Sequence, residues 1–333
     1  MAFKYPCCIF QAFICFKEIS MITGIVFILI GFILLYFGAE WLVNGAANLA
    51  KMAGVSQLVV GLTVVAFGTS APELVVSLHS GLQEHGNIAI GNVVGSNICN
   101  IALILGLSSL IYPVKINLQI LRFDAPLMML VTIVFSFMLF QHKLSQIEGF
   151  ILFAGIIAYT AYSIFKAKRG NSSCNFDEEI PGDINSIPIC IFFVFAGIIS
   201  LVLGSKALVH GAVVIARLFH VSEAVIGLTI VAVGTSLPEL ATSVFAAIKK
   251  HSDISVGNVI GSNIFNILCI VGATASITPI NFPDIGTIDI AFMLGLSILL
   301  YPFMLSGKIL NRIEGAILLF SYIGYIIILL LKE

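Results

Sequence analysis

Two short stretches of the chain place a proline and a glutamate inside long apolar segments. They read GTSAPELVVS from Gly68 and GTSLPELATS from Gly234. Carboxylates are expensive in lipid, so an acidic residue at membrane depth indicates a functional site. Each proline removes a helix hydrogen bond and frees the carbonyl four residues earlier, that of Gly68 or Gly234. Such a carbonyl must face protein or water, and it is also a suitable ligand for a hard cation.

Each glutamate shares a helical face with further oxygen-bearing groups, because residues three or four apart lie on one side of a helix. The first face holds Ala66, Thr69, Ser70, Glu73 and Ser77, and the second holds Ala232, Thr235, Ser236, Glu239 and Ser243. The next apolar segment adds a polar row at a spacing of four, which is Asn92, Ser96 and Asn100 in one case and Asn258, Ser262 and Asn266 in the other. An all-oxygen set of ligands favours Ca²⁺ or Na⁺ over soft metals.

Glycines at positions 91 and 95, and again at 257 and 261, form GxxxG faces that permit close helix contact. We expect them to bring each polar row against its GTSxPE partner, so that Ser96, Asn100, Ser262 and Asn266 point toward the two glutamates. Asn97 and Asn263 are expected to form interhelical hydrogen bonds rather than to bind an ion. Two carboxylates at one site need charge compensation, which one divalent or two monovalent cations, or protons, can supply.

Composition places these stretches in a membrane protein. Of the 333 residues, 59% are hydrophobic and only 10% are charged, and the mean hydropathy is +1.11; an average soluble domain has about 25% charged residues. The net charge of −1 gives no basis for a nucleic-acid partner. The seven cysteines form no CxxC pair, and we interpret them as small buried hydrophobic residues.

Apolar runs of membrane length predict an all-α membrane protein with ten transmembrane helices in the lipid bilayer. The runs cover residues 23–48, 55–81, 86–110, 122–141, 146–166, 187–216, 221–248, 253–277, 285–305 and 311–331. We divide the chain into an N-terminal extension of doubtful function (1–21), a five-helix repeat (22–166), a cytoplasmic linker (167–186) and a second five-helix repeat (187–333). Both motifs recur at a constant offset of 166 residues.

Because each repeat crosses the membrane five times, the second must start on the opposite side, so we expect two inverted repeats. Ten Lys and Arg residues fall on the side of the linker and five on the side of the N-terminus. This bias predicts that both termini lie outside the cell membrane.

The segments GTSAPE, GNVVGSNICN, GTSLPE and GNVIGSNIFN resemble the two alpha-repeats of the cation/calcium antiporter superfamily, and most closely its prokaryotic sodium/calcium exchangers. The resemblance implies that Glu73 and Glu239 are the central acids. It implies that the other ion ligands are the hydroxyl groups of Thr69, Ser70, Ser96, Thr235, Ser236 and Ser262, the backbone carbonyls of Ala66 and Ala232, and the side chains of Asn100 and Asn266. It also implies that the first and sixth spans are the moving pair.

We therefore expect a monomeric secondary antiporter that exchanges Ca²⁺ for Na⁺ by alternating access and needs no cofactor. Threonine at positions 69 and 235 favours Na⁺ over H⁺ as the counter-ion, since proton/calcium exchangers of the superfamily usually carry asparagine there. A proton/calcium or other cation/proton antiporter remains the alternative, and a passive channel is a third. An intramembrane enzyme is disfavoured because the sequence shows no nucleophile–base pair and no HExxH motif.

Overall fold

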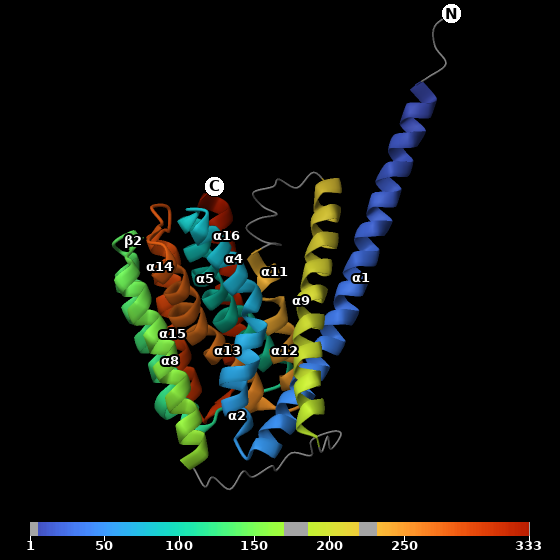
Figure 1. Ribbon diagram of the computed structural model, residues 1–333. Coiled ribbons are helices and arrows are strands. Elements are labelled where there is room, and N and C mark those ends of the chain that lie inside the picture. Colours follow the sequence, from blue (N-terminus) through green and yellow to red (C-terminus); the bar gives the residue numbers. More distant parts are fainter. Residues whose placement is uncertain (1–5, 170–185, 220–231, 333) are drawn as a thin grey trace, which may run out of the picture.

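The computed structural model describes residues 6–169, 186–219 and 232–332, and side chains within 20–166, 186–219 and 233–331. Its longer helices are α1 (Pro6–Ala53), α4 (Ala71–Leu82), α5 (Gly86–Ile98), α7 (Ala125–Leu139), α8 (Gln146–Arg169), α9 (Ile187–Leu218), α12 (Leu237–Ile248), α13 (Ser252–Phe265), α15 (Thr287–Leu305) and α16 (Arg312–Lys332). Shorter helices are α2 (Gln57–Val60), α3 (Ala66–Thr69), α6 (Gly106–Ile111), α11 (Ala232–Thr235) and α14 (Gly272–Ile277). The π-helical segments η1 (Gly61–Val65), η2 (Cys99–Leu105), η3 (Ile120–Asp124) and η5 (Asn266–Val271) connect several of them. The predicted all-helical class is confirmed (Figure 1).

Eight helical segments of the described part are long and apolar enough to cross a membrane. They cover Ser20–Ala53, Gly86–Ile111, Ile120–Leu139, Gln146–Lys166, Ile187–Leu218, Ser252–Ile277, Thr287–Leu305 and Arg312–Leu331. The helical pieces Gln57–Thr69 and Ala71–Leu82 are bent by 48° relative to each other and form either one broken span or a re-entrant loop. The span expected at 221–248 is described only from Ala232 onward, and residues 170–185 of the expected linker also lie outside the described part. Helix α1 begins at Pro6, so residues 6–21 of the expected N-terminal extension are part of this helix.

Both glutamate-bearing stretches are broken at a serine. Ser70 has φ −83° and ψ 9°, and Ser236 has φ −87° and ψ 5°, values outside the regular helix range. The proline follows two residues later, in the first turn of α4 or α12. A proline is tolerated there because the N–H groups of a first turn have no helix partner. The sequence thus restarts the helix at each motif, with the glutamate in its first turn.

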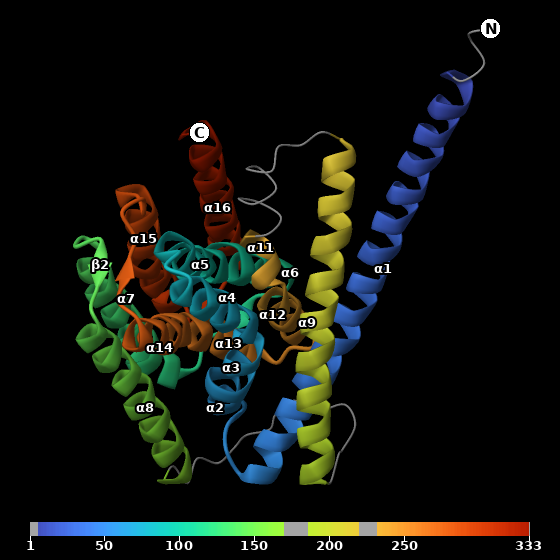
Figure 2. The ribbon, with the colours of Figure 1, turned by 45° about the horizontal axis from the view of Figure 1, so that its top comes forward.

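Helices α1 and α9 lie side by side at one edge of the bundle in both ribbon views (Figures 1 and 2). Their contact is a row of glycines seven residues apart, which we call the glycine seam: Gly24, Gly31, Gly38 and Gly45 on α1, and Gly197, Gly204 and Gly211 on α9. A Cβ atom added at Gly31 would lie 2.7 Å from the backbone nitrogen of Leu208. Small residues at this spacing allow the two antiparallel backbones to touch. The seam was not predicted from the sequence.

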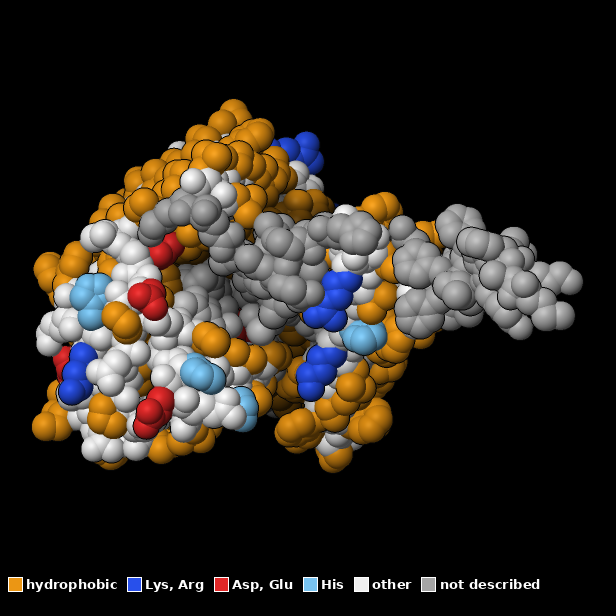
Figure 3. Space-filling model, turned by 90° about the horizontal axis from the view of Figure 1, so that it is seen from above, with side chains coloured by type: hydrophobic (Ala, Val, Ile, Leu, Met, Phe, Trp, Pro, Cys, Tyr) orange, Lys and Arg blue, Asp and Glu red, His pale blue; other side chains and the backbone are white. Residues whose placement is uncertain are grey.

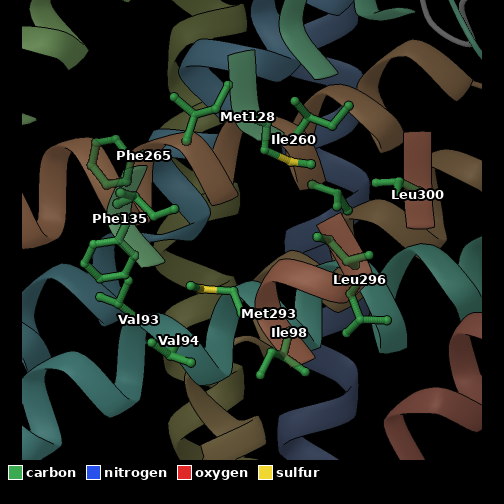
Figure 4. Close-up of a cluster of buried hydrophobic side chains, with 14 of the residues drawn as sticks. Val93, Val94, Ile98, Met128, Phe135, Ile260, Phe265, Met293, Leu296 and Leu300 are labelled. Carbon is green, nitrogen blue, oxygen red and sulfur yellow. The ribbon is translucent and has the colours of Figure 1, made fainter. Parts of the chain in front are cut away.

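The spans that contain α5 and α13 are the most deeply buried of the eight. Val93, Val94 and Ile98 of α5 and Ile260 and Phe265 of α13 pack with residues of α7 and α15 in a buried apolar cluster (Figure 4). Strand β1 (Val114–Lys115) pairs with β4 (Ile309–Leu310), and β2 (Lys143–Leu144) pairs with β3 (Ile280–Asn281). Each pair therefore joins a loop of the first half to a loop of the second.

The surface agrees with a membrane setting. Large hydrophobic side chains such as Phe137, Phe192 and Phe320 are exposed. Seen from above, hydrophobic side chains cover the rim of the helix bundle, whereas acidic and histidine side chains gather on the end face (Figure 3). Such a distribution is expected when lipid contacts the sides and water contacts the ends.

Candidate ion-binding site

The two glutamates are buried at the centre of one polar site. Glu73 and Glu239 are each only 1% exposed. The Ser70 hydroxyl donates to Oε1 of Glu239 over 2.7 Å, and the Ser236 hydroxyl donates to Oε1 of Glu73 over 3.1 Å. Each carboxylate is thus held by the serine of the opposite stretch. Both also lie in the first turn of a helix, where free N–H groups and the helix dipole stabilise negative charge.

Serines of the following helices extend the site. The Ser70 hydroxyl lies 3.0 Å from that of Ser262 on α13, and the Ser236 hydroxyl lies 3.3 Å from that of Ser96 on α5. All four hydroxyls are buried. The sequence predicted that these serines lie near the carboxylates, and the structure brings them together. That each serine contacts residues of the opposite half of the chain was not predicted.

Asn92 and Asn258 connect the two halves. The Asn92 amide donates to the carbonyl oxygen of Glu73 over 3.2 Å and to Ser77 Oγ over 2.9 Å. Its oxygen accepts from the Thr235 hydroxyl over 3.5 Å. Asn258 makes the equivalent bonds to Glu239 and Ser243, and it accepts from Thr69 over 3.0 Å. These two asparagines position both glutamate-bearing helices, a role that their membership of the polar rows did not reveal.

Four further asparagines form interhelical hydrogen bonds, which were expected for Asn97 and Asn263 but not for Asn100 and Asn266. The Asn266 amide donates to Asn97 Oδ1 over 3.0 Å, and the Asn100 amide donates to Asn263 Oδ1 over 3.4 Å. This confirms the interhelical role of Asn97 and Asn263. The Nδ2 atoms of Asn100 and Asn266 donate these hydrogen bonds, whereas their Oδ1 atoms accept none within the described residues. The Oδ1 atoms are therefore the ones available to an ion.

Four buried oxygen atoms of the predicted ligands have no hydrogen-bond partner within the described residues. They are Glu73 Oε2, Glu239 Oε2, Asn100 Oδ1 and Asn266 Oδ1. An unpaired buried acceptor typically costs about 1–3 kcal/mol, and more when it is charged. All four can accept but not donate, and each half supplies one carboxylate and one amide oxygen. A hard cation satisfies such a set of oxygens. The described part contains no group of three or more histidine, cysteine or acidic side chains that could hold a metal ion, so carboxylates alone do not make up the set.

The close helix approach predicted from GxxxG is present on α13. A Cβ atom at Gly257 would lie 3.1 Å from the carbonyl oxygen of Leu58, and one at Gly261 would lie 2.6 Å from that of Leu62. The partner of these glycines is therefore the glutamate-bearing stretch of the first half, and not the GTSLPE stretch of their own half that the sequence led us to expect. At the same offset, the partners of Gly91 and Gly95 would fall within or next to residues 220–231, which lie outside the described part.

The backbone carbonyls of the motifs are less open than expected. The carbonyl of Ala66 accepts from the Ser70 N–H over 3.1 Å and lies 3.4 Å from the Thr69 hydroxyl. The carbonyl of Gly234, which Pro238 frees, accepts from the Ser205 hydroxyl on α9. A carbonyl freed by a proline must face either protein or water. The carbonyl of Gly234 faces protein, because the Ser205 hydroxyl contacts it. The ligand roles of Ala66 and Ala232 remain predictions.

Comparisons with known proteins show which family the sequence matches. The sequence model of the sodium/calcium exchanger protein family matches residues 23–165 and 189–331. The sodium/calcium exchanger MaX1 of Methanosarcina acetivorans is 32% identical, over 93% of this chain and 99% of that protein. The inner membrane protein YrbG of Escherichia coli is 37% identical, over 78% of this chain and 81% of that protein.

Solved structures of the sodium-calcium exchanger NCX_Mj resemble this chain over almost its whole length. One, soaked without Na⁺ and Ca²⁺, has a TM-score of 0.80 and 32% identity, and covers 93% of this chain and 99% of that one. Another, soaked with Na⁺ and Sr²⁺, has a TM-score of 0.79 at 32% identity over 92% of this chain and 98% of that one.

Proposed function

The chain belongs to the sodium/calcium exchanger protein family, and we propose that it is a secondary antiporter that exchanges Ca²⁺ for Na⁺ across a membrane. The observation that carries the proposal is the pair of buried carboxylates, each with one oxygen lacking a partner among the described residues. Together they supply about −2 charge, which one Ca²⁺ or two Na⁺ would neutralise. Exchange follows because one cation can leave only as another takes over its charge-balancing role.

The ligand set of this proposal combines the two carboxylates with neutral oxygens. Glu73 and Glu239 bind the ion directly, joined by the side-chain oxygens of Asn100 and Asn266. The hydroxyls of Thr69, Ser70, Ser96, Thr235, Ser236 and Ser262 and the carbonyls of Ala66 and Ala232 complete the shell as ligands or as supports of a ligand. Ca²⁺ takes six to eight oxygens, and this set provides enough without a further acidic group.

We further propose that the chain forms ten transmembrane helices in two inverted five-helix repeats. Two observations support this. The strands β3 and β4 lie 166 residues after β1 and β2, and the strand pairs exchange partners in the way that a two-fold axis between the halves requires. The hydrogen bonds of the site cross between the halves in equivalent pairs, Ser70 with Glu239 and Ser236 with Glu73.

Alternating access in this proposal comes from movement of α1 and α9 past the site-bearing helices. The glycine seam holds these two helices together through direct backbone contact, so they can move as one body. The protein acts in the cell membrane, as a monomer, with both termini outside. Ca²⁺ and Na⁺ are the transported ions.

Flux in membrane vesicles tests the proposal. Purified protein is reconstituted and ⁴⁵Ca²⁺ uptake is measured with an outward Na⁺ gradient, with a pH gradient alone, and with neither. The proposal predicts uptake that requires the Na⁺ gradient. Uptake supported by the pH gradient alone would identify a proton/calcium antiporter, and uptake without any counter-ion gradient would identify a passive channel.

A further inference from the structure

Helix α9 contacts both places where the glutamate-bearing stretches break, whereas α1 lies elsewhere. A Cβ atom at Gly68 would meet the side chain of Ile198, and one at Gly234 would meet that of Val209, both on α9. On α1, Ala39 is 1% exposed and belongs to a buried apolar cluster with Phe245 of α12. The first helices of the two halves, α1 and α9, therefore make different contacts with the glutamate-bearing stretches, although their sequences are related by a constant offset.

The contact at Gly234 includes a hydrogen bond. The hydroxyl of Ser205 on α9 donates to the Gly234 carbonyl, which lacks a helix partner because Pro238 has no N–H. Ser205 is buried, so water does not compete for this carbonyl. The bond ties the mobile pair of helices to the residue directly before Thr235 and Ser236 of the ion site.

No other residue of α9 can replace Ser205 when the helix shifts. One turn away in either direction, α9 offers Leu201, Val202, Leu208 and Val209, and none of these side chains has a hydrogen-bond donor. A shift of one turn in either direction would therefore leave the Gly234 carbonyl buried without a donor, which is unfavourable at membrane depth.

The first half of the chain lacks this donor. The residue 166 positions before Ser205 is Ala39, and the one 166 positions before Gly234 is Gly68. In the opposite state of an inverted-repeat transporter the two halves exchange roles, so Ala39 would face Gly68. Alanine has no hydroxyl, and the carbonyl that Pro72 frees would not gain an equivalent bond from α1.

We propose that Ser205 is a one-sided latch, a positioning residue that favours the state seen here over its inverted counterpart. This rests on the proposed function, because it assumes that α1 and α9 move between two such states. One hydrogen bond of this kind shifts an equilibrium by roughly two- to tenfold. The apparent affinity for a transported ion at each membrane face scales with the population of the state open to that face. The latch therefore sets the ratio of the Ca²⁺ KM values at the two faces.

The test measures the KM for Ca²⁺ at each membrane face, in vesicles that contain the protein in one orientation or the other. Ser205→Ala weakens the present state, and Ala39→Ser strengthens the opposite state. Both are expected to move the ratio of the two Ca²⁺ KM values in the same direction, by roughly two- to tenfold each, and the double variant should move it further. Ser205→Thr keeps a hydroxyl and should resemble the wild type. Ser200→Ala is the matched control, because Ser200 donates to the Leu34 carbonyl inside the moving pair, over 2.8 Å, and that bond does not depend on the state.

Hydrogen–deuterium exchange of the detergent-solubilised protein gives a readout that does not need transport. Exchange in the segment 233–240 should be faster in Ser205→Ala and unchanged in Ser200→Ala. Equal exchange in these two variants, or an unchanged KM ratio in Ser205→Ala, would overturn the latch. Absence of Na⁺-dependent Ca²⁺ flux in the wild type would instead overturn the proposed function, and the exchange measurement would still decide whether Ser205 holds this segment.

Discussion

Replacing one carboxylate of the site should separate Ca²⁺ binding from Na⁺ binding. Glu73→Gln and Glu239→Gln change the charge of the site from about −2 to about −1 while preserving the shape of the side chain. The amide oxygen can still accept the serine hydroxyl that Oε1 accepts now. A bound Ca²⁺ would then leave one positive charge uncompensated in a site where both glutamates are 1% exposed, whereas a single Na⁺ would be balanced.

The size of the effect follows from the burial. Removing one partner of a buried, hydrogen-bonded charge pair costs about 3–5 kcal/mol, and each 1.4 kcal/mol is about a factor of ten in affinity. Ca²⁺ affinity should therefore fall by at least about 100-fold in either variant, and Ca²⁺ flux should be abolished at micromolar Ca²⁺. Affinity for one Na⁺ should fall much less. The empty protein should remain folded, because the substitution removes repulsion between the carboxylates.

Isothermal titration with Ca²⁺ and Na⁺, together with the thermal midpoint in detergent, measures these quantities. Glu84→Gln is a suitable control, since it removes the same charge at an exposed position. Near-normal Ca²⁺ flux in either site variant would mean that the ion binds elsewhere. An equal loss of Ca²⁺ and Na⁺ binding would refute the charge-balance reasoning even if the location is right.

Three further changes test the supporting structure. Gly38→Ala should lower the thermal midpoint, at a cost of about 1–3 kcal/mol, because the new Cβ would lie 2.9 Å from a backbone nitrogen of α9; Gly295→Ala, on an exposed part of α15, should leave it unchanged. Asn258→Ala removes the donor to the Glu239 carbonyl, so Ca²⁺ affinity measured by titration should fall about tenfold, and an unchanged value would contradict its positioning role. Burial, reinforced by a nearby lysine, lowers the pKa of His251 below its ordinary value of 6.5. The unfolded chain therefore binds this proton more readily, so stability should be complete above about pH 6.5 and fall at lower pH; a melting series of His251→Asn that kept the same pH slope would argue against this.

Much of the fold could be predicted because the sequence repeats itself. Long apolar runs predicted most of the apolar helices that the structure shows. The acidic residues inside them pointed to the buried polar cluster around Glu73 and Glu239, because a carboxylate is costly at membrane depth unless it has a function. The serines and asparagines of the polar rows were found by helical spacing alone. Most helix ends were also close to their observed positions, because the polar loops between apolar runs are short. The first helix is an exception, since the expected span 23–48 lies within a longer helix that begins at Pro6 and ends at Ala53.

The pairing of these residues could not be predicted. Spacing along one helix places Ser70 near Glu73, yet its hydroxyl bonds to Glu239 of the other half. Which half supplies each partner depends on how the helices cross in three dimensions, and periodicity holds no information on that. Asn92 and Asn258 were recognised as polar but not as bridges for the same reason.

The glycine seam between α1 and α9 was not predicted, although its glycines can be read from the sequence. Glycines at positions 24, 31, 38 and 45 are visible in the sequence, and small residues on one face of a membrane helix permit close helix packing. In a chain with 29 glycines the pattern is easily overlooked. Ser205 could not be singled out at all, because its importance depends on a carbonyl that only the folded chain brings to α9.

Anomalous diffraction from crystals soaked in Sr²⁺, a heavier analogue of Ca²⁺, tests the central claim most directly. The account predicts a single strong peak between Glu73 and Glu239, within ligand distance of a carboxylate from each half, and loss of that peak when Na⁺ is raised. A Sr²⁺ peak bound by only one of the two glutamates, or located away from both, would contradict a site shared between the two halves.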